Sequence, residues 1–372
     1  MSEHPDHSAS SATHTPASVV ADAERLTGFA AEALEAAGAS PADAAVTAHV
    51  LVRTDLRGVH THGVHQLPNH VRNLVEGGTT SPVDVEVVRE TPVTAVLDGH
   101  GGMGHVVATR ARELAVDKAR TSGMATVLVR GGNHLGAVGH YALEAAEAGF
   151  IAMTTSNTSP IMTAAGSTRK LISNAPFAYA VPMEGFPMVF DVAMSATAGF
   201  KLHMAAEQGE PVALGLLVDA DGNPTTDPAD YRRGGALLPI GGHKGYGMAL
   251  LTETLAGVLS GAGITSEVAS WLREPGTPTN AGASFIVMDV ECFMDRPDFQ
   301  RRMRQLVDGL HAAEPAPGIE RILVPGELEA EREHAARRDG VTLERVTWTH
   351  LDQVAIALGL EERLAGVPVA AF

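Results

Sequence analysis

The spacing of apolar and polar residues predicts helices at both ends of the chain. Apolar positions recur at helical spacing through the alanine-rich residues 17–56, and Gly38 divides this stretch in two. The second helix is expected over about Pro41–Leu56, because proline suits the first turn of a helix. The pattern is helical again over residues 327–339 and 349–359.

Strands and helices alternate through the middle of the chain. Alternating apolar and polar residues over 83–98 predict two short strands. Further strands are expected within residues 125–130, 150–157, 177–192, 211–219, 284–290 and 321–329, and helices at residues 105–120, 139–148, 248–260 and 296–311. The terminal helices, residues 17–80 and 328–372, are therefore expected to form one discontinuous domain around a sheet-containing domain of residues 81–327.

Charge and composition narrow the classes of function. The 372 residues include 27 lysines and arginines against 44 aspartates and glutamates, which gives a formal net charge of −17. That field repels phosphate backbones and anionic membranes, and aromatic residues, at 4%, are too few for base-stacking platforms. We therefore expect a small-molecule substrate, with no nucleic acid and no membrane as partner.

The sequence gives little indication of a signal peptide, a membrane-spanning segment or a cysteine-based site. Residues 1–16 are polar, lack the apolar core of a signal peptide and are expected to form a disordered tail. The most apolar stretch, residues 245–264, is interrupted by Thr252–Thr254, so it is expected to be a core helix and the protein to be cytoplasmic. The single cysteine, Cys292, excludes an intrachain disulfide and argues against a cysteine-based metal site.

A glycine-rich segment, Gly99–Gly104, matches the G-x-G-x-x-G pattern of dinucleotide-binding loops. It follows a strand-like segment and precedes a helix, the setting in which such a loop cradles a pyrophosphate. However, a Rossmann fold needs a series of β-α-β units, and the residues before position 80 are helical in pattern. A chain with 39 glycines also contains such matches by chance. We interpret the segment as a structural turn and keep a Rossmann dehydrogenase as an alternative.

Four histidines crowd residues 55–70, at positions His60, His62, His65 and His70. Neutral imidazoles can converge on zinc, so a metal-dependent hydrolase built on His60, His62 and His65 is one alternative. The spacing is weakly specific, and no aspartate or glutamate lies between His60 and His70. Histidine also exchanges protons near neutral pH, so a general acid is the sharper interpretation and a solvated loop the plainer one. No metal is expected.

Five ordered motifs span most of the chain. They are D-L-R-G-V-x-T-H-G-V from residue 55, G-G-N-H-L-G-A-V-G-H-Y from 131, S-N-A-P-F-A-Y-A-V-P from 173, F-D-V-A-M-S from 190 and L-P-I-G-G-H-K-G-Y-G from 238. Together, over about residues 17–360, they are similar to the malate/L-lactate dehydrogenase family of the non-Rossmann type. That family includes sulfolactate, ureidoglycolate and diketogulonate enzymes and piperideine-carboxylate reductase.

The resemblance implies an α+β fold in which the nucleotide-binding domain, residues 81–327, holds a mixed, largely antiparallel sheet and is not a Rossmann fold. It also implies hydride transfer between NAD or NADP and a 2-hydroxy, 2-oxo or cyclic 2-imino acid, and a homodimer. The sequence leaves open which acid is the substrate and which of the two cofactors is used.

The resemblance also implies three catalytic residues. His62 stands where the family places its catalytic histidine, as proton donor in reduction and base in oxidation. His134 is implied near the substrate, and a purely structural histidine at a strand–helix junction is the alternative. Asp191 follows an apolar run, where a lone carboxylate is costly unless paired. It is implied to lie near the nicotinamide and orient the imidazole, and a salt bridge is the alternative.

Nucleotide contacts are implied at several turns. Gly241–Gly247 opens a helix, where free N–H groups and the positive end of the helix dipole attract phosphate, and Lys244 adds a charge. Each of these turns could also be an ordinary connection. The implied cofactor-binding residues are Ser156, Asn157, Thr158, Asn174, Pro176, Asp191, Val192, Ala193, His243, Lys244, Gly245, Pro325, Gly326 and Glu327.

Gln66 and His70 depart from the pattern of the family. The family commonly has an arginine near the position of Gln66, available for the substrate carboxylate, and an aromatic residue at that of His70. A neutral amide cannot replace a bidentate guanidinium. The carboxylate would then be held by Arg57 or Arg53, with Arg57 and Gln66 as the substrate-binding candidates, or the substrate is not a plain 2-oxo acid. A catalytically retired binding protein is therefore a further alternative.

Overall fold

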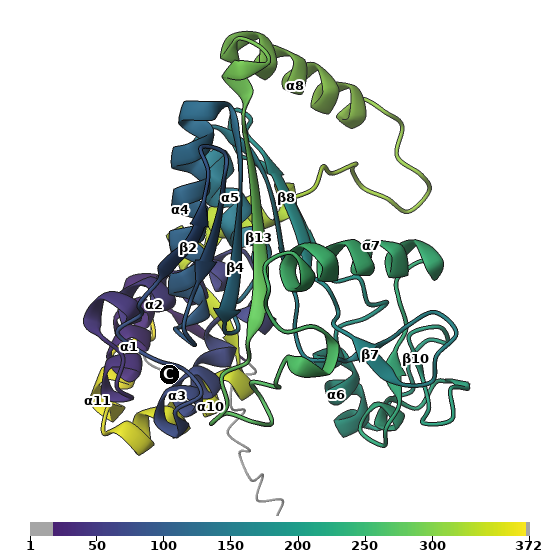
Figure 1. Ribbon diagram of the computed structural model, residues 1–372. Helices are drawn as coiled ribbons and strands as arrows, with labels where there is room; N and C mark the ends of the chain where they lie inside the picture. Colours follow the sequence, from purple (N-terminus) through teal and green to yellow (C-terminus); the bar gives the residue numbers. More distant parts are fainter. Residues whose placement is uncertain (1–17, 370–372) are drawn as a thin grey trace, which may run out of the picture.

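The structure is a computed structural model that describes residues 18–369, apart from the side chain of Phe200 (Figure 1). The tail expected over residues 1–16 lies outside the described residues. The described chain is an α+β protein with one large mixed sheet and two smaller sheets, which confirms the fold class expected from the sequence. Among these residues, no helix combines the length and the apolar character that a membrane crossing requires.

A seven-stranded sheet runs through the centre of the molecule in the order β2-β3-β4-β13-β5-β8-β9 (Figure 1). Its strands are β2 (Glu86–Glu90), β3 (Thr94–Asp98), β4 (Met124–Gly132), β5 (Phe150–Ser156), β8 (Phe177–Val181), β9 (Met188–Val192) and β13 (Ala281–Asp289). All neighbouring pairs are antiparallel except β3 and β4. Because a Rossmann fold is built on a parallel sheet, this order excludes the Rossmann alternative.

The Gly99–Gly104 segment joins β3 to helix α4 (Gly104–Ser122) and serves close packing. A Cβ atom on Gly104 would lie 2.3 Å from the carbonyl oxygen of Asn133, and one on Gly102 would lie 2.8 Å from the Val83 side chain. Only glycine fits such an approach of two backbones. The interpretation of this segment as a structural turn therefore holds.

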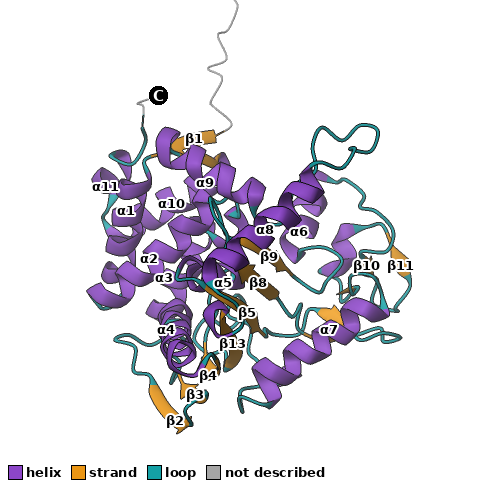
Figure 2. Cartoon of the chain, turned by 90° about the horizontal axis from the view of Figure 1, so that it is seen from above, coloured by secondary structure: helices purple, strands orange, loops and turns teal. Residues whose placement is uncertain are grey.

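Helices α4 and α5 (Val138–Glu147) pack against the sheet and against each other (Figure 2). Their small apolar residues meet the buried faces of the central strands in one continuous core, in which Tyr141 and Phe285 are fully buried. Because α5 follows β4 after a short loop, its N-terminus opens at one end of the sheet. That end carries the candidate site.

Segments from both ends of the chain form one helical group beside the sheet (Figures 1 and 2). Strand β1 (Ser18–Ala21) pairs antiparallel with β14 (Val341–Glu344), and one apolar cluster links the helices of both ends. These helices are α1 (Ala23–Ala36), α2 (Pro41–Leu56), α3 (Leu67–Glu76), α10 (Arg345–Leu358) and α11 (Glu361–Ala365). The domain boundaries at residues 80 and 328 stay a prediction.

A five-stranded sheet in the order β11-β10-β12-β6-β7 lies on the side of the central sheet away from the helical group (Figure 1). Its strands are β6 (Met162–Thr163), β7 (Lys170–Ile172), β10 (Leu217–Val218), β11 (Pro224–Thr225) and β12 (Ala236–Leu237). The remaining helices are α6 (Gly199–Gln208), α7 (His243–Glu253), α8 (Arg296–His311) and α9 (Glu327–Asp339). Helix α7 continues into a π-helical turn at Thr254–Val258.

Local expectations are wrong in three places. Residues 18–21 form strand β1 and not the start of a helix, because they pair with β14 from the far end of the chain. Residues 321–324 are not a strand, and the chain there runs beside β9, with the Val189 N–H donating to the Pro325 carbonyl at 3.0 Å. The helix expected over residues 248–260 begins earlier, at His243, and it is not a core helix, because Leu251, Val258 and Leu259 are exposed.

Candidate active site

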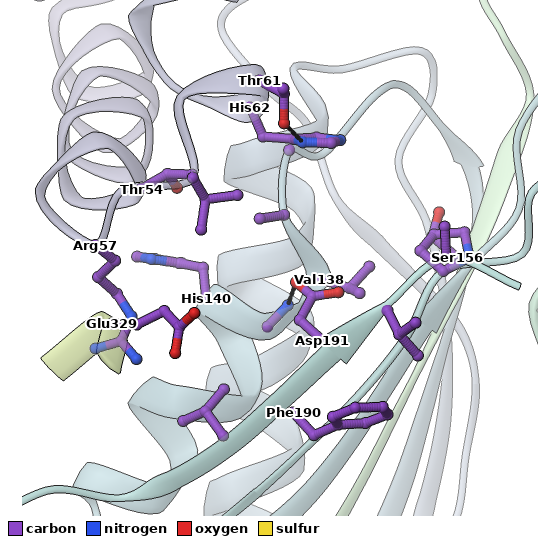
Figure 3. Close-up of a pocket in the computed structure, with 18 of the residues that line it drawn as sticks. Thr54, Arg57, Thr61, His62, Val138, His140, Ser156, Phe190, Asp191 and Glu329 are labelled. Atoms are coloured by element: carbon purple, nitrogen blue, oxygen red, sulfur yellow. Dashed lines mark hydrogen bonds between the residues drawn. The ribbon is translucent and has the colours of Figure 1, made fainter. Parts of the chain in front are cut away.

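A cavity of about 670 Å³ lies where α2 and its following turn face the first turn of α5, strand β9 and the segment before α9 (Figure 3). This volume is in the range of small-molecule and cofactor sites. It brings together residues from distant parts of the chain. The predicted site residues that line it are Arg57, His62, His134, Ser156, Asn157, Thr158, Asn174, Pro176, Asp191, Val192, Ala193, Pro325 and Gly326.

The other predicted site residues do not line this cavity. The Gln66 side chain turns back to its own turn, where its Nε2 donates to the Thr61 carbonyl at 2.8 Å. His243 and Lys244 are exposed at the start of α7, next to the buried Gly245. Glu327 accepts from the Val324 N–H at 3.0 Å. Their roles in binding stay predictions.

A buried carboxylate fixes the turn that carries His62. The Asp55 side chain at the end of α2 accepts from the Val64 N–H at 2.7 Å, and its other oxygen lies 2.8 Å from Nδ1 of His60. A Cβ atom on Gly63 would lie 2.2 Å from this carboxylate, so glycine is required for the close approach. Burial raises the pKa of Asp55, whereas its hydrogen bond raises the pKa of His60.

His62 and His134 face each other inside the cavity. Their rings are stacked, with centroids 5.9 Å apart and planes 14° apart, and Nδ1 of His62 lies 3.0 Å from the hydroxyl of Thr61. Burial lowers the pKa of His62 and lowers that of His134 well below the ordinary histidine value. Both imidazoles are therefore neutral near pH 7, and a neutral imidazole can accept a proton at one nitrogen and donate one from the other.

The three histidines of the metal alternative do not converge. His60 is paired with Asp55, His62 with Thr61, and Nδ1 of His65 lies 3.1 Å from the hydroxyl of Thr347. Among the described residues, the one group with metal-ligand spacing is a different one, formed by His49, His140 and Glu144. There Arg53 and Arg112 already pair with the Glu144 carboxylate, at 3.7 and 2.9 Å, and their positive charges oppose a metal ion.

Asp191 projects from β9 into the cavity (Figure 3). It accepts from the Gly139 N–H at 2.8 Å, in the first turn of α5. A Cβ atom on Gly139 would lie 2.7 Å from the carboxylate, so a side chain there would displace it. Asp191 is exposed to the cavity, but the cavity walls hold most of the solvent away from its carboxylate. This desolvation raises the pKa of Asp191 to about 6, and the hydrogen bond from the Gly139 N–H opposes the shift.

The N-terminus of α5 opens into the cavity, and its N-cap residue, Ala137, provides no side-chain cap, although the Gly139 N–H donates to Asp191. Residues Gly136–His140 all line the cavity. The free N–H groups and the positive end of the helix dipole at such a terminus favour an anion. His140 was not among the predicted site residues, although it lies within the motif that begins at residue 131, because a helical position gave no sign that it would face a ligand.

Arg57 is the one lysine or arginine among the described residues that line the cavity. Its Nη1 donates to the Glu333 carboxylate of α9 at 2.9 Å, and Glu329 of the same helix lines the cavity beside it (Figure 3). The Glu333 carboxylate thus balances part of the charge of Arg57, and the remaining N–H groups of the guanidinium can donate to a second carboxylate.

The cavity also offers donors and an apolar surface that suit a dinucleotide. Ser156 ends β5 and Asn157 follows it. The Ser156 hydroxyl donates to the Gly282 carbonyl at 2.9 Å, and the Thr158 hydroxyl donates to Oδ1 of Asn174 at 3.3 Å, so each can still accept from a ligand. The Asn157 amide is already engaged, because its Nδ2 donates to the Gly263 carbonyl at 2.9 Å and its Oδ1 accepts from the Gly282 N–H. Phe190 of β9, in the segment 190–193 that the resemblance implies to lie along the cofactor, is exposed and lines the cavity. Hydroxyls, a helix N-terminus and an aromatic ring together fit phosphate, ribose and a flat base.

The largely antiparallel central sheet makes this an α+β protein of a non-Rossmann class, with a partly open cavity lined by two neutral histidines. The family described as malate/L-lactate dehydrogenase matches this chain over residues 21–352. The chain therefore belongs to the malate/L-lactate dehydrogenase family, and the expectation that it is an oxidoreductase of this type is confirmed.

Known relatives can be aligned with this chain along nearly their whole length. The chain is 33% identical to a malate dehydrogenase of Pyrococcus horikoshii, covering 91% of this chain and 95% of the relative. It is 36% identical to an L-sulfolactate dehydrogenase of Methanocaldococcus jannaschii, covering 88% and 94%. A solved structure of sulfolactate dehydrogenase from the latter organism superposes with a TM-score of 0.85 at 34% identity, covering 92% of this chain and 98% of that one.

Proposed function

We propose that this protein transfers a hydride between NAD or NADP and a 2-hydroxy or 2-oxo acid, or a cyclic 2-imino acid, with His62 as the general acid and base. One observation carries the proposal. A single cavity is lined by His62 and His134, by the first turn of α5 with Asp191 bound to it, and by the hydroxyl residues Ser156 and Thr158. The names of the relatives, which are dehydrogenases of malate and sulfolactate, support the class of substrate.

The residues divide the chemistry between them. A bound NAD or NADP supplies or accepts the hydride. In reduction, His62 donates a proton to the carbonyl oxygen of the substrate, and in oxidation it removes the proton from the hydroxyl. Because its pKa is lowered, His62 is protonated in a small fraction of molecules near pH 7, and that protonated form is a stronger acid. The Asp191 carboxylate, which accepts from the Gly139 N–H, is a second group that can bind a proton beside the reacting atoms.

Arg57 and the N-terminus of α5 are the candidates for holding the substrate carboxylate and the cofactor phosphates. Arg57 keeps donors free beyond its bond to Glu333, and the α5 N–H groups face the same space. Gln66 supports the catalytic turn from behind through Thr61. The proposed specificity therefore depends on Arg57 more than on Gln66.

A spectrophotometric screen tests the proposal. The protein would be mixed with NADH or NADPH and a panel of 2-oxo acids and cyclic imino acids, and loss of nicotinamide absorbance would be followed. We expect turnover of at least one acid, and preference for one cofactor. Binding of NADH by calorimetry without turnover of any acid would favour the retired binding protein, and absence of cofactor binding would contradict the proposal.

The same proposal includes a homodimer in the cytoplasm. Helix α7 and the turn after it leave apolar side chains exposed, among them Leu251 at 50% and Val258 and Leu259 at 60% each. Contiguous exposed apolar residues mark a surface that another protein covers. A second copy of the chain is the partner that the family resemblance implies.

A further inference from the structure

His134 separates two cavities. On one side it lines the candidate active site, and on the other it lines a cavity of about 10 Å³ together with His70, His105 and Trp271. The smaller volume is about the space that one water molecule needs. His70 comes from α3 and His105 from the first turn of α4, so three separate elements each bring an imidazole to this place.

The three imidazole rings pack against one another. The ring centroids of His134 and His70 are 5.7 Å apart, those of His70 and His105 are 4.7 Å apart, and those of His105 and His134 are 6.4 Å apart. The indole of Trp271 stacks on His134 at 4.0 Å and on His70 at 5.1 Å. This packing restricts the orientation of each ring.

Several ring nitrogens here are buried and have no hydrogen-bond partner among the described residues. They are Nε2 of His70, both nitrogens of His105 and Nδ1 of His134. A buried polar atom without a partner is costly, and a single water with two to four polar neighbours would satisfy several of them at once. The small cavity between the rings is therefore polar enough for an internal water.

The charged neighbours that shift the pKa values of this cluster in the described chain are other imidazoles. They are the three members themselves, His62 from the catalytic turn and, toward His105, His140 from α5. Without a carboxylate to hold a positive charge, burial lowers the pKa of His70 to about 4 and lowers those of His105 and His134 well below the ordinary value. The rings are neutral at pH 7, and a neutral imidazole passes a proton by accepting at one nitrogen and releasing from the other.

We propose that His70, His105 and a water molecule in the small cavity form a proton-transfer network that serves the active site through His134. The inference rests on the proposed function. In reduction, His62 gives its proton to the substrate oxygen and regains one from the facing His134. His134 in turn takes up a proton at Nδ1 from the water, and His70 or His105 gives a proton to that water. In oxidation the proton moves the other way. No electrons move in these steps, and the network regains its protons by exchange with solvent at each turnover.

A first experiment measures turnover in variants of the network. His70→Phe keeps a flat ring against Trp271 but cannot carry a proton, and His70→Gln keeps hydrogen bonding without titrating. We expect kcat to fall by about tenfold in both, with little change in the KM for cofactor. The dependence of kcat on the deuterium content of the solvent should be curved in the wild type, because several protons move, and linear in the variants.

A second experiment needs no turnover. The chain has two tryptophans, so Trp348→Phe leaves Trp271 as the sole indole, and its fluorescence reports protonation of the imidazoles stacked on it. We expect His105→Phe to move the pH midpoint of this signal by about 0.5 unit or more, because coupled groups titrate together. His203→Phe, on the surface helix α6, is the matched control and should leave the midpoint and kcat unchanged.

The two experiments separate the network from the proposed function. Equal midpoints in the wild type, His70→Phe and His105→Phe, with normal turnover, would overturn the network and leave the dehydrogenase intact. Coupled midpoints in a protein that turns over no acid would support the network of imidazoles and contradict the proposed function. Linear deuterium dependence in the wild type would also overturn the network.

Discussion

At the scale of the residue, His62 is the group on which the proposed chemistry depends. We predict that His62→Asn lowers kcat by about 10²–10⁴, the usual contribution of a general acid. Asparagine keeps a polar side chain of similar reach beside Thr61, so NADH binding, measured by cofactor fluorescence, should be kept. His203→Asn serves as the control. Near-wild-type turnover in His62→Asn would mean that His134, and not His62, is the proton donor.

Asp191 gives a prediction about pH. Its pKa of about 6 in the folded protein lies above the ordinary value of 3.8, so the native state binds this proton more tightly than the unfolded state. The contribution of Asp191 to the free energy of unfolding is therefore present at low pH and is lost as the pH rises through about 6. Asp191→Asn, which can still accept from Gly139, should remove this loss.

Urea denaturation of the wild type and Asp191→Asn at several pH values between 4 and 7 measures this effect. We expect the variant to gain in stability relative to the wild type as the pH rises. A difference in free energy of unfolding that stays constant over this range would show that the Asp191 carboxyl has an ordinary pKa in the folded protein.

Much of the candidate cavity could be predicted from sequence, because the motifs that resemble the family carry most of its lining residues. The sequence did not reveal which way a side chain turns. Gln66 lies in the right turn but bonds back to Thr61, whereas His140 lies within a recognised motif and lines the cavity without having been selected. The direction of a side chain is set by its neighbours in the folded protein, such as Thr61 for Gln66, which no local pattern encodes.

At the scale of the element, boundaries set by local chemistry were predicted well. Helix α2 covers Pro41–Leu56 as expected, because Ser40 caps it by accepting from the Asp43 N–H and proline opens it. Strand β1 was missed, because only its pairing with the distant β14 makes it a strand. The extended segment before α9 was mistaken for a strand for the converse reason: its apolar residues pack beside β9, but they do not pair as a strand.

Lys244 at the start of α7 tests whether that helix terminus serves the cofactor. If its charge meets a phosphate in both ground and transition states, Lys244→Ala should raise the KM for cofactor with little change in kcat. The exposed Lys201 of α6 provides the control variant Lys201→Ala. An unchanged KM would mean that the terminus of α7 has no part in cofactor binding, and a large fall in kcat at saturating cofactor would make Lys244 part of the catalytic apparatus.

At the scale of the whole molecule, the exposed apolar side chains of α7 predict self-association. Leu251→Glu should convert the dimer to a monomer, because a buried charge without a partner opposes assembly. Light scattering coupled to size-exclusion chromatography would show a particle of half the wild-type mass. Leu306→Glu places the same charge on α8, at a leucine that is also about half exposed, and should leave the mass unchanged. A wild type that is already monomeric would contradict the prediction.

The pairing of β1 with β14 constrains the order in which the protein can be completed during synthesis. Val19 and Ala21, at the beginning of the chain, are fully buried against a strand that begins at Val341. On the ribosome, β1 therefore has no partner strand until the chain has been made past Val341. Val19 and Ala21 lack that cover until then, and a nascent chain that stalls before Val341 would be a preferred client for chaperones that bind unfolded segments.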